Sequence, residues 1–233
     1  MNGPLILGEA ISVKTIDINA SVGAGFEGDN SAHDEKIMKR ISSANIACGF
    51  HGGDPAVMQR SVDFALKYDV AIGAHLGLPN LMGLDQVIAK VSPKKAKVQA
   101  LYQIGALSAF AAAGSRRIQH VKLQGVLCEK AREDYELAHA IAQAVASIDD
   151  KIILMASADS QLIQAGKDVG LPVACEAFID AIASLDALKL DSDIDSIAVD
   201  SEAPYALGLL DEIHRSLRKE GVKVAALSTP NLD

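Results

Sequence analysis

Short runs of apolar residues alternate along this chain with longer segments of helical periodicity, and this alternation constrains the fold most. Seven runs are predicted as buried strands, and one more is a candidate eighth: 15–19, 43–47, 70–74, 120–122, 152–156, 173–176 and 196–199, then 222–227. Strands that alternate with helices are parallel and are joined by right-handed crossovers. We therefore predict an α/β fold, and the strand count favours a closed barrel over an open sheet.

The starts of two helices are marked by their capping residues. Asp54 and Pro55 form an N-cap and first-turn pair, and Ser92 and Pro93 form another. Further helices are predicted over 134–147, 160–169 and 204–220. No linker rich in Pro, Gly or Ser divides the chain and no repeat of fixed period is found, so the prediction is a single domain over residues 1–233.

The composition argues against binding to nucleic acid or insertion into a membrane, and it favours the cytoplasm. A formal net charge of −8 is the opposite of the basic footprint that nucleic-acid binding requires. No window approaches the roughly 18 apolar residues of a membrane helix, and the start of the chain lacks the pattern of a signal peptide. Cys48, Cys128 and Cys175 are an odd number of widely spaced cysteines, so free thiols and a cytoplasmic location are expected.

The segment 42–55, SSANIACGFHGGDP, is the predicted centre of any chemistry. It leads from a strand into a helix, and ligands of parallel α/β folds bind at that end of the strands. Its glycines allow the backbone to approach a ligand closely, and the N-terminus of the helix that follows favours the binding of an anion. His51, between glycines, is predicted to act as an acid, a base or a metal ligand. The alternative is a tight turn in which the glycines relieve strain and Asp54 only caps the helix.

Two further strands place polar residues at the same end. His75 follows the strand 70–74, so the two histidines after neighbouring strands are expected to converge. Asp17 and Asn19 share one side of the first strand, where a carboxylate holds a metal, an ammonium group or a histidine. The alternative is a hydrogen-bonded pair that stabilises the barrel. The other histidines are expected to be structural: His33, His120, His139 and His214.

Three charged residues complete the predicted mouth. Lys122 ends its strand, where an ammonium group would neutralise a carboxylate or a phosphate. Glu176 and Asp180 would supply a general base, or either would be the ion-pair partner of Lys122. Cys48 has no histidine placed to activate it locally, so it is expected to be a small buried packing residue.

Several motifs carry a resemblance to a known family: DINA (17–20), SANIACGFHGGDP (43–55), GAH (73–75), YQIGAL (102–107), HVK (120–122) with Gly125, and ExFxD (176–180). With them the chain resembles the LamB/YcsF family of bacterial 5-oxoprolinase A subunits from Asp17 to about Leu227. The resemblance implies a distorted seven-stranded (β/α) barrel of the glycoside hydrolase/deacetylase type. It also implies ATP-dependent opening of the lactam of 5-oxoproline to glutamate, together with partner subunits.

On this resemblance the catalytic residues are His51, Asp17 and His75. The implied substrate-binding residues are Asn19, Asn45, Gly49, Gly52, Gly53, Lys122, Glu176 and Asp180. Backbone N–H groups of 49–53 would stabilise the oxyanion that forms when an amide carbonyl is attacked.

The chain departs from the usual motifs of the family at ten positions near the predicted mouth: Ser21, Ala24, Asn80, Gln86, Val87, Gln124, Cys128, Ala181, Asp200 and Glu202. Three of the lost side chains are arginines, and each such loss removes a bidentate, charge-assisted contact to an anion. Two other hypotheses therefore stand beside a divergent lactam hydrolase. One is a catalytically degenerate paralogue that acts as a binding or assembly module. The other is a deacetylase-like hydrolase in which Asp17, His51 and His75 hold a divalent metal.

Overall fold

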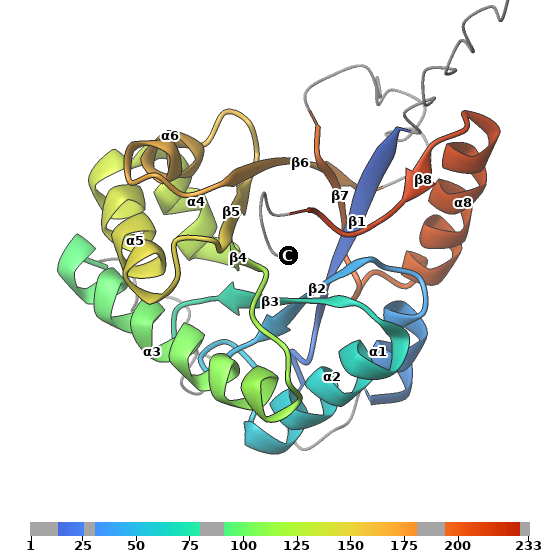
Figure 1. Ribbon diagram of the computed structural model, residues 1–233, viewed down its shortest axis with the longest axis horizontal. Helices are drawn as coiled ribbons and strands as arrows, with labels where there is room; N and C mark the ends of the chain where they lie inside the picture. The colour runs from blue at the N-terminus through green and yellow to red at the C-terminus, as the bar shows by residue number, and fades with distance from the viewer. Residues whose placement is uncertain (1–13, 26–30, 80–90, 181–193, 229–233) are drawn as a thin grey trace, which may run out of the picture.

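A computed structural model describes residues 14–25, 31–79, 91–180 and 194–228 of the chain. Seven parallel strands close into a barrel in sequence order, because β1 pairs with both β2 and β7 (Figure 1). The strands are β1 (Thr15–Val22), β2 (Ser43–Ala47), β3 (Ala71–Leu76), β4 (His120–Leu123), β5 (Ile153–Ala156), β6 (Val173–Ile179) and β7 (Ser196–Val199). The predicted seven-stranded α/β barrel is confirmed.

The helices lie outside the strands, along the left, lower and right sides of the barrel in Figure 1. They are α1 (Ser31–Met38), α2 (Pro55–Tyr68), α3 (Pro93–Ala113), α4 (Gly125–Glu133), α5 (Tyr135–Ile148), α6 (Gln161–Asp168) and α8 (Ala206–Lys219). The sequence did not predict α1 or α4. Only Ile37 and Met38 of α1 are buried, and α4 begins at a glycine with no side-chain cap, so neither carries a strong helix signal. No helix in the described ranges has the length and apolarity needed to cross a membrane.

The prediction of a strand over 222–227 is wrong beyond its first half. Only β8 (Lys223–Val224) pairs with the start of β1, and the chain leaves the ladder after the N–H of Ala225 has donated to the Ile16 carbonyl (3.0 Å). Instead, residues 225–228 cross the N-terminal end of the barrel. The carbonyl of Leu227 accepts a hydrogen bond from Gln119 Nε2 (2.7 Å), and the Leu227 side chain packs on Ile153 and its inward-facing neighbours.

Alternation along the strands separates an apolar shell from a polar interior. In β1, Ile16, Ile18, Ala20 and Val22 belong to the main core between strands and helices, whereas Asp17 and Asn19 face the barrel axis. Barrel interiors of this kind are usually filled by branched apolar side chains. Here the inner apolar cluster of the described residues is small: Ile153, Met155 and Ala174, with Leu227.

Four positions at which the chain departs from the family motifs, Asn80, Gln86, Val87 and Ala181, lie outside the described residues. Ser21 is partly exposed on the inward side of β1, and Cys128 lies on α4, close enough to Glu176 and Lys122 to feel their charges. Asp200 follows β7 and accepts a hydrogen bond from the Glu202 backbone N–H (3.0 Å).

Candidate active site

Asp17 lies near the N-terminal end of the barrel, surrounded by hydroxyl groups. Its Oδ1 accepts hydrogen bonds from Ser42 and Ser43 (both 2.6 Å), and its Oδ2 accepts one from Ser196 (2.5 Å). Burial raises the pKa of this carboxyl above its ordinary value of 3.8, while the three hydroxyl donors lower it. The arrangement corresponds to the alternative in which Asp17 holds strands together, since Ser42 and Ser43 come from the start of β2 and Ser196 from β7.

Asn19 joins this cluster to the centre of the barrel. Its amide nitrogen donates to Ser196 Oγ (2.8 Å) and to Glu176 Oε2 (3.2 Å). Its amide oxygen accepts from Asn45 Nδ2 (2.8 Å) and from Lys122 Nζ (3.1 Å). The amide nitrogen and the amide oxygen of Asn19 therefore make two hydrogen bonds each. The four partners lie on four different strands, and together they fix the orientation of the side chain.

Lys122 and Glu176 form an ion pair inside the barrel, with Nζ 2.6 Å from Oε2. The two side chains are 14% and 11% exposed, so the pair is shielded from water yet reachable from the mouth. The pair is the structural alternative expected from the sequence. It does not remove a role in binding, because the Lys122 ammonium group has three donors and its bonds to Asn19 and Glu176 use two of them.

His51 and His75 lie together at the C-terminal end of the strands. Their rings meet edge to face, with centroids 5.2 Å apart. His51 comes from the turn after β2, and His75 is the fifth residue of β3, facing the barrel axis beside Lys122 in the next strand. Buried His51 Nδ1 and His75 Nε2 have no hydrogen-bond partner among the described residues. Each of the two adjacent rings therefore keeps one nitrogen that can accept a proton.

Both imidazoles are held neutral at pH 7. Burial lowers the pKa of His51 to about 4. Burial, together with the neighbouring His51 and Lys122, lowers the pKa of His75 well below 6.5, although a hydrogen bond to the Leu123 backbone acts in the opposite direction. A neutral imidazole with a free nitrogen is a proton acceptor, so the pair has the chemistry of a general base.

The glycine-rich turn holds His51 in place, and two of its backbone N–H groups already make hydrogen bonds. The N–H of Gly49 donates to the Gly52 carbonyl (2.8 Å), and that of Gly53 donates to the Gly25 carbonyl (3.3 Å). A Cβ at Gly52 would lie 2.3 Å from the Ala24 oxygen, so only glycine allows the turn to pack on the segment after β1. The N–H groups of Gly49 and Gly53 are therefore occupied, which reduces the set of oxyanion donors expected from 49–53.

The remaining predicted residues lie apart from this centre. Asp54 caps α2 by accepting hydrogen bonds from the N–H groups of Ala56 and Val57 (2.8 and 2.9 Å). Asp180 is exposed directly after β6. Cys48 is buried, and burial raises the pKa of its thiol to about 12, in keeping with a packing role.

His120, expected to be structural, is buried in the barrel, where its Nε2 lies 2.9 Å from Asn45 Oδ1, in keeping with that role. One residue that supports the site was not found from the sequence. The side-chain amide of Gln103 in α3 makes two hydrogen bonds to the backbone of Gly77. Its Oε1 accepts from the Gly77 N–H (3.0 Å), and its Nε2 donates to the Gly77 carbonyl (3.1 Å). A Cβ at Gly77 would lie 2.3 Å from the His51 ring, so Gln103 fixes the backbone on which that ring rests. A glutamine on an otherwise apolar helix face is the sequence signal that could have found it.

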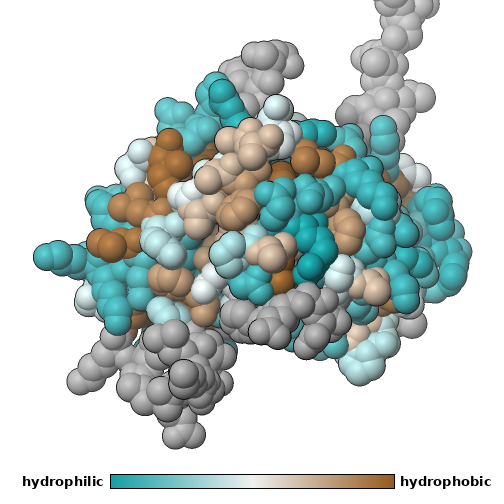
Figure 2. Space-filling model, turned by 90° about the horizontal axis from the view of Figure 1, so that it is seen from below, coloured by the Kyte–Doolittle hydropathy of each residue, from teal (hydrophilic) through white to brown (hydrophobic). Residues whose placement is uncertain are grey.

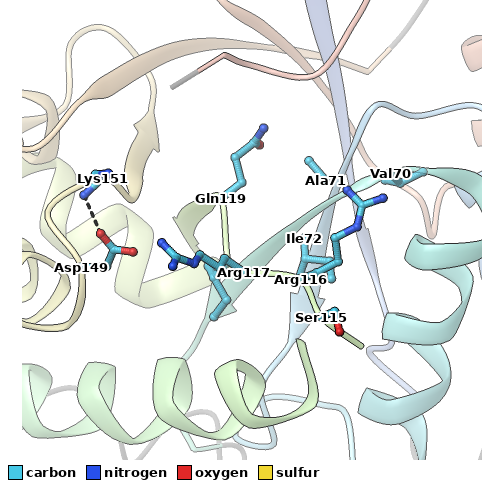
Figure 3. A pocket seen from close by; sticks show the side chains of 10 residues that line it. Val70, Ala71, Ile72, Ser115, Arg116, Arg117, Gln119, Asp149 and Lys151 are labelled. Atoms are coloured by element: carbon cyan, nitrogen blue, oxygen red, sulfur yellow. Dashed lines mark hydrogen bonds between the residues drawn. The ribbon is translucent and has the colours of Figure 1, made fainter. Parts of the chain in front are cut away.

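A hollow of about 590 Å³ opens at the other end of the barrel, before β3, β4 and β5 (Figure 3). Arg116, Arg117, Gln119, Asp149 and Lys151 supply its polar lining. Arg116 is already paired with Asp69 (2.6 Å), and the groups are mostly at the surface. The residues that line the hollow contribute none of the buried polar atoms that lack a partner among the described residues. Gln119 reaches the barrel network through His120 Nδ1 (3.1 Å), but its polar atoms are already satisfied, so the mouth with the histidines is the stronger site.

A metal centre built from Asp17, His51 and His75 does not fit this geometry. The described residues contain no group of three or more His, Cys, Asp or Glu side chains placed to hold a metal ion. Asp17 lines the N-terminal end of the barrel with Thr15 and Ile16, whereas the histidines lie at the C-terminal end.

Fold and site together define a parallel (β/α) barrel whose interior is a continuous polar network with a pair of neutral histidines at its mouth. Comparison with known proteins makes the assignment specific. Residues 16–188 match the LamB/YcsF family, and the chain belongs to that family.

Individual relatives of the chain support its membership of this family. It is 36% identical to the A subunit of 5-oxoprolinase from Tolumonas auensis, over 91% of this chain and 99% of the relative. It is 33% identical to the protein of the same name from Pyrococcus abyssi, over 91% and 97%. Among solved structures, the lactam utilization protein from Thermus thermophilus superposes with a TM-score of 0.80 at 31% identity, over 91% of this chain and all of that one.

Proposed function

We propose that this chain is the A subunit of a 5-oxoprolinase and hydrolyses the cyclic amide of 5-oxoproline within an assembly that uses ATP. The proposal is supported by its full-length similarity to proteins with that name and to a lactam utilization protein. The observation that carries it is the site itself. Two neutral histidines with unpartnered nitrogens stand next to a shielded ammonium group at the C-terminal end of a barrel.

The chemistry of lactam opening matches these groups. Water adds to the carbonyl carbon, the ring C–N bond breaks, and the nitrogen gains a proton to give the amine of glutamate. The neutral pair of His51 and His75 takes a proton from the attacking water and returns one to the leaving nitrogen. Lys122, held in place by Glu176 and Asn19, offers its third N–H donor to the anionic part of the substrate.

The barrel interior does not fit the triphosphate of ATP. Among the described residues facing the axis, Lys122 is the cation of the network, and Glu176 already compensates its charge. Nucleotides are usually held by several cations or by a run of free backbone N–H groups. We therefore assign the use of ATP to the assembly as a whole and derive no step through it in this chain.

We also propose that the protein works in the cytoplasm. No disulfide involves Cys48, Cys128 or Cys175, all of which lie in the described part of the chain, and this is usual in a reducing compartment.

The test is reconstitution of the purified chain with the other 5-oxoprolinase subunits from the same source, followed by measurement of glutamate released from 5-oxoproline and ATP. Lys122→Met is expected to lower turnover at least about 100-fold, because it removes the charge at the site. Lys67→Met is the matched control, since it breaks the exposed ion pair of Lys67 with Glu35 (2.8 Å), far from the barrel axis. Assembly that forms with no glutamate release by the unaltered chain would contradict the proposal.

A further inference from the structure

The outer face of α3 is apolar along most of its length. From Val98 to Ala113 the helix contains no charged residue, although one side of it faces solvent. The exposed residues follow helical spacing: Val98, Leu101, Tyr102, Gly105, Ala109 and Ala112. Surface helices normally direct charged residues outward. On α8 the outward positions are Asp211, Arg215 and Arg218, which shows that this chain follows the rule elsewhere.

Large and small side chains are separated along this α3 face. Val98 is 61% exposed and Tyr102 is 63% exposed, so together with Leu101 they form a ridge. Beyond it, a Cβ at Gly105 would meet no atom within 4 Å, and alanines continue the small surface. Figure 2 looks at the side of the molecule on which α2 and α3 lie in Figure 1, and hydrophobic residues there interrupt the hydrophilic surface.

The ridge is held rigid and is linked to the site. The ring of Tyr102 stacks on Phe50, with centroids 5.3 Å apart and planes 26° from parallel. Phe50 directly precedes His51, and Gln103, next to Tyr102, fixes the backbone at Gly77 against the His51 ring. A protein bound to this face would therefore touch Tyr102, which packs on the residue before His51 and is the chain neighbour of the buried Gln103.

Basic residues stand at both ends of the face. Lys94 and Lys95 are exposed in the first turn of α3, where a positive charge opposes the helix dipole and costs stability. Arg117 is exposed just after the other end. None of these three has an ion-pair partner in the described part of the chain. In a protein of net charge −8, such a distribution is complementary to carboxylates.

The charges also decide which partner fits. In a two-fold dimer with antiparallel α3 helices, Lys94 and Lys95 would meet Arg117 of the second copy, and in a parallel one like residues would meet. Either arrangement places positive charges together, which is costly at an interface. The face therefore suits a different chain.

We propose that the outer face of α3 is the docking surface for another subunit of the assembly, one that presents an apolar ridge flanked by carboxylates. This inference rests on the proposed function, since it takes the chain to be one subunit of several. Docking at α3 places the partner beside the loop that carries His51, so assembly and the active site are physically joined.

The test measures the affinity of the purified chain for the other 5-oxoprolinase subunits from the same source by a binding assay without substrate. Gly105→Glu places a charge in the open centre of the face and is expected to raise the dissociation constant at least about 30-fold. Gly208→Glu is the matched control, because Gly208 is also an exposed helical glycine with no atom within 4 Å of its Cβ position. Its affinity is expected to stay within twofold of the unaltered chain.

Three outcomes would overturn the docking surface. Gly105→Glu binds within threefold of the unaltered chain, the unaltered chain binds none of these subunits, or it forms a dimer that Gly105→Glu abolishes. Failure of the proposed function is a separate result. The subunits then assemble, and Gly105→Glu prevents it, but the assembled complex releases no glutamate.

Discussion

Both ends of the barrel interior contain buried polar side chains, but the hydrogen-bonding capacity of these side chains is satisfied to different degrees. At the N-terminal end, both oxygens of Asp17 are occupied by three hydroxyl donors. At the C-terminal end, His51 and His75 each keep a buried nitrogen without a partner among the described residues. A saturated cluster stabilises the fold, whereas an unsaturated one retains free energy of interaction for a ligand. The contrast therefore separates an architectural part of the interior from a chemical part.

The largest expected effect is at the architectural end. Asp17→Ala leaves the buried hydroxyl groups of Ser43 and Ser196 without this acceptor and removes one of the two acceptors of the half-buried Ser42, so the free energy of unfolding should fall by about 3–5 kcal/mol. Urea denaturation followed by circular dichroism measures the change. Asp17→Asn keeps the shape and one acceptor and should lose less. If Asp17→Ala unfolds at the same urea concentration as the unaltered chain, the cluster does not stabilise the barrel.

The second effect is at the chemical end and should appear in turnover. His51→Ala should leave the free energy of unfolding within about 1 kcal/mol, because one nitrogen of the ring has no hydrogen bond to lose. Glutamate release by the assembled enzyme should fall at least about 100-fold, the usual contribution of a general base. His139→Ala, on the exterior helix α5, is the control and should leave turnover unchanged. Equal activity of His51→Ala and the control would remove His51 from the mechanism.

Gln103→Met tests the connection between the α3 helix and His51. The change leaves the N–H and carbonyl of Gly77 without their side-chain partner, which should cost about 1–2 kcal/mol of stability. Because Gln103 positions His51 and touches no substrate, kcat should fall about tenfold while KM changes little. Gln59→Met, on the exposed face of α2, should change neither. A fall in stability with normal kcat would make Gln103 purely structural.

The smallest effect concerns pH. The folded-state pKa of His51 is about 4, whereas an unfolded histidine titrates near 6.5. Between these values the unfolded chain binds more protons, so the free energy of unfolding falls as the pH is lowered from 6.5 towards 4. His51→Gln should reduce this slope by about 1 kcal/mol per pH unit, measured by urea unfolding at about pH 4.5, 5.5 and 6.5. Identical slopes would mean that His51 remains accessible to protons in the folded protein.

Much of the fold could be predicted from the sequence because alternation and capping are local signals. The strands 43–47 and 196–199 have the predicted bounds, and Asp17 and Asn19 face the same side of β1 as the spacing required. The approach of His51 to His75 followed from the rule that the ends of neighbouring parallel strands lie together.

The partners of these residues could not be predicted in the same way. Ser42, Ser43 and Ser196 are ordinary serines in sequence, and only barrel closure brings them to one carboxylate. His120 was expected to be structural because of its place at the start of its strand, but its partner Asn45, 75 residues away, could not be predicted. Residues 225–228 continue an apolar run, but the carbonyl of Leu227 accepts a hydrogen bond from the Gln119 side chain and not from a neighbouring strand. In each case a contact distant in sequence overrides the local pattern.

Closure of the barrel by β1 against β7 has a consequence for how the chain folds. Asp17 pairs in register with Ser196, so the first strand completes its sheet only when residues near the other end of the chain have been made. During synthesis β1 can pair with β2 early, but Asp17 and Asn19 lack Ser196 until β7 has been made, and the edge of β1 that pairs with β7 stays open. Contacts this distant slow folding and leave strand edges open in the meantime. Slow, chaperone-sensitive maturation is thus built into the connectivity of the protein.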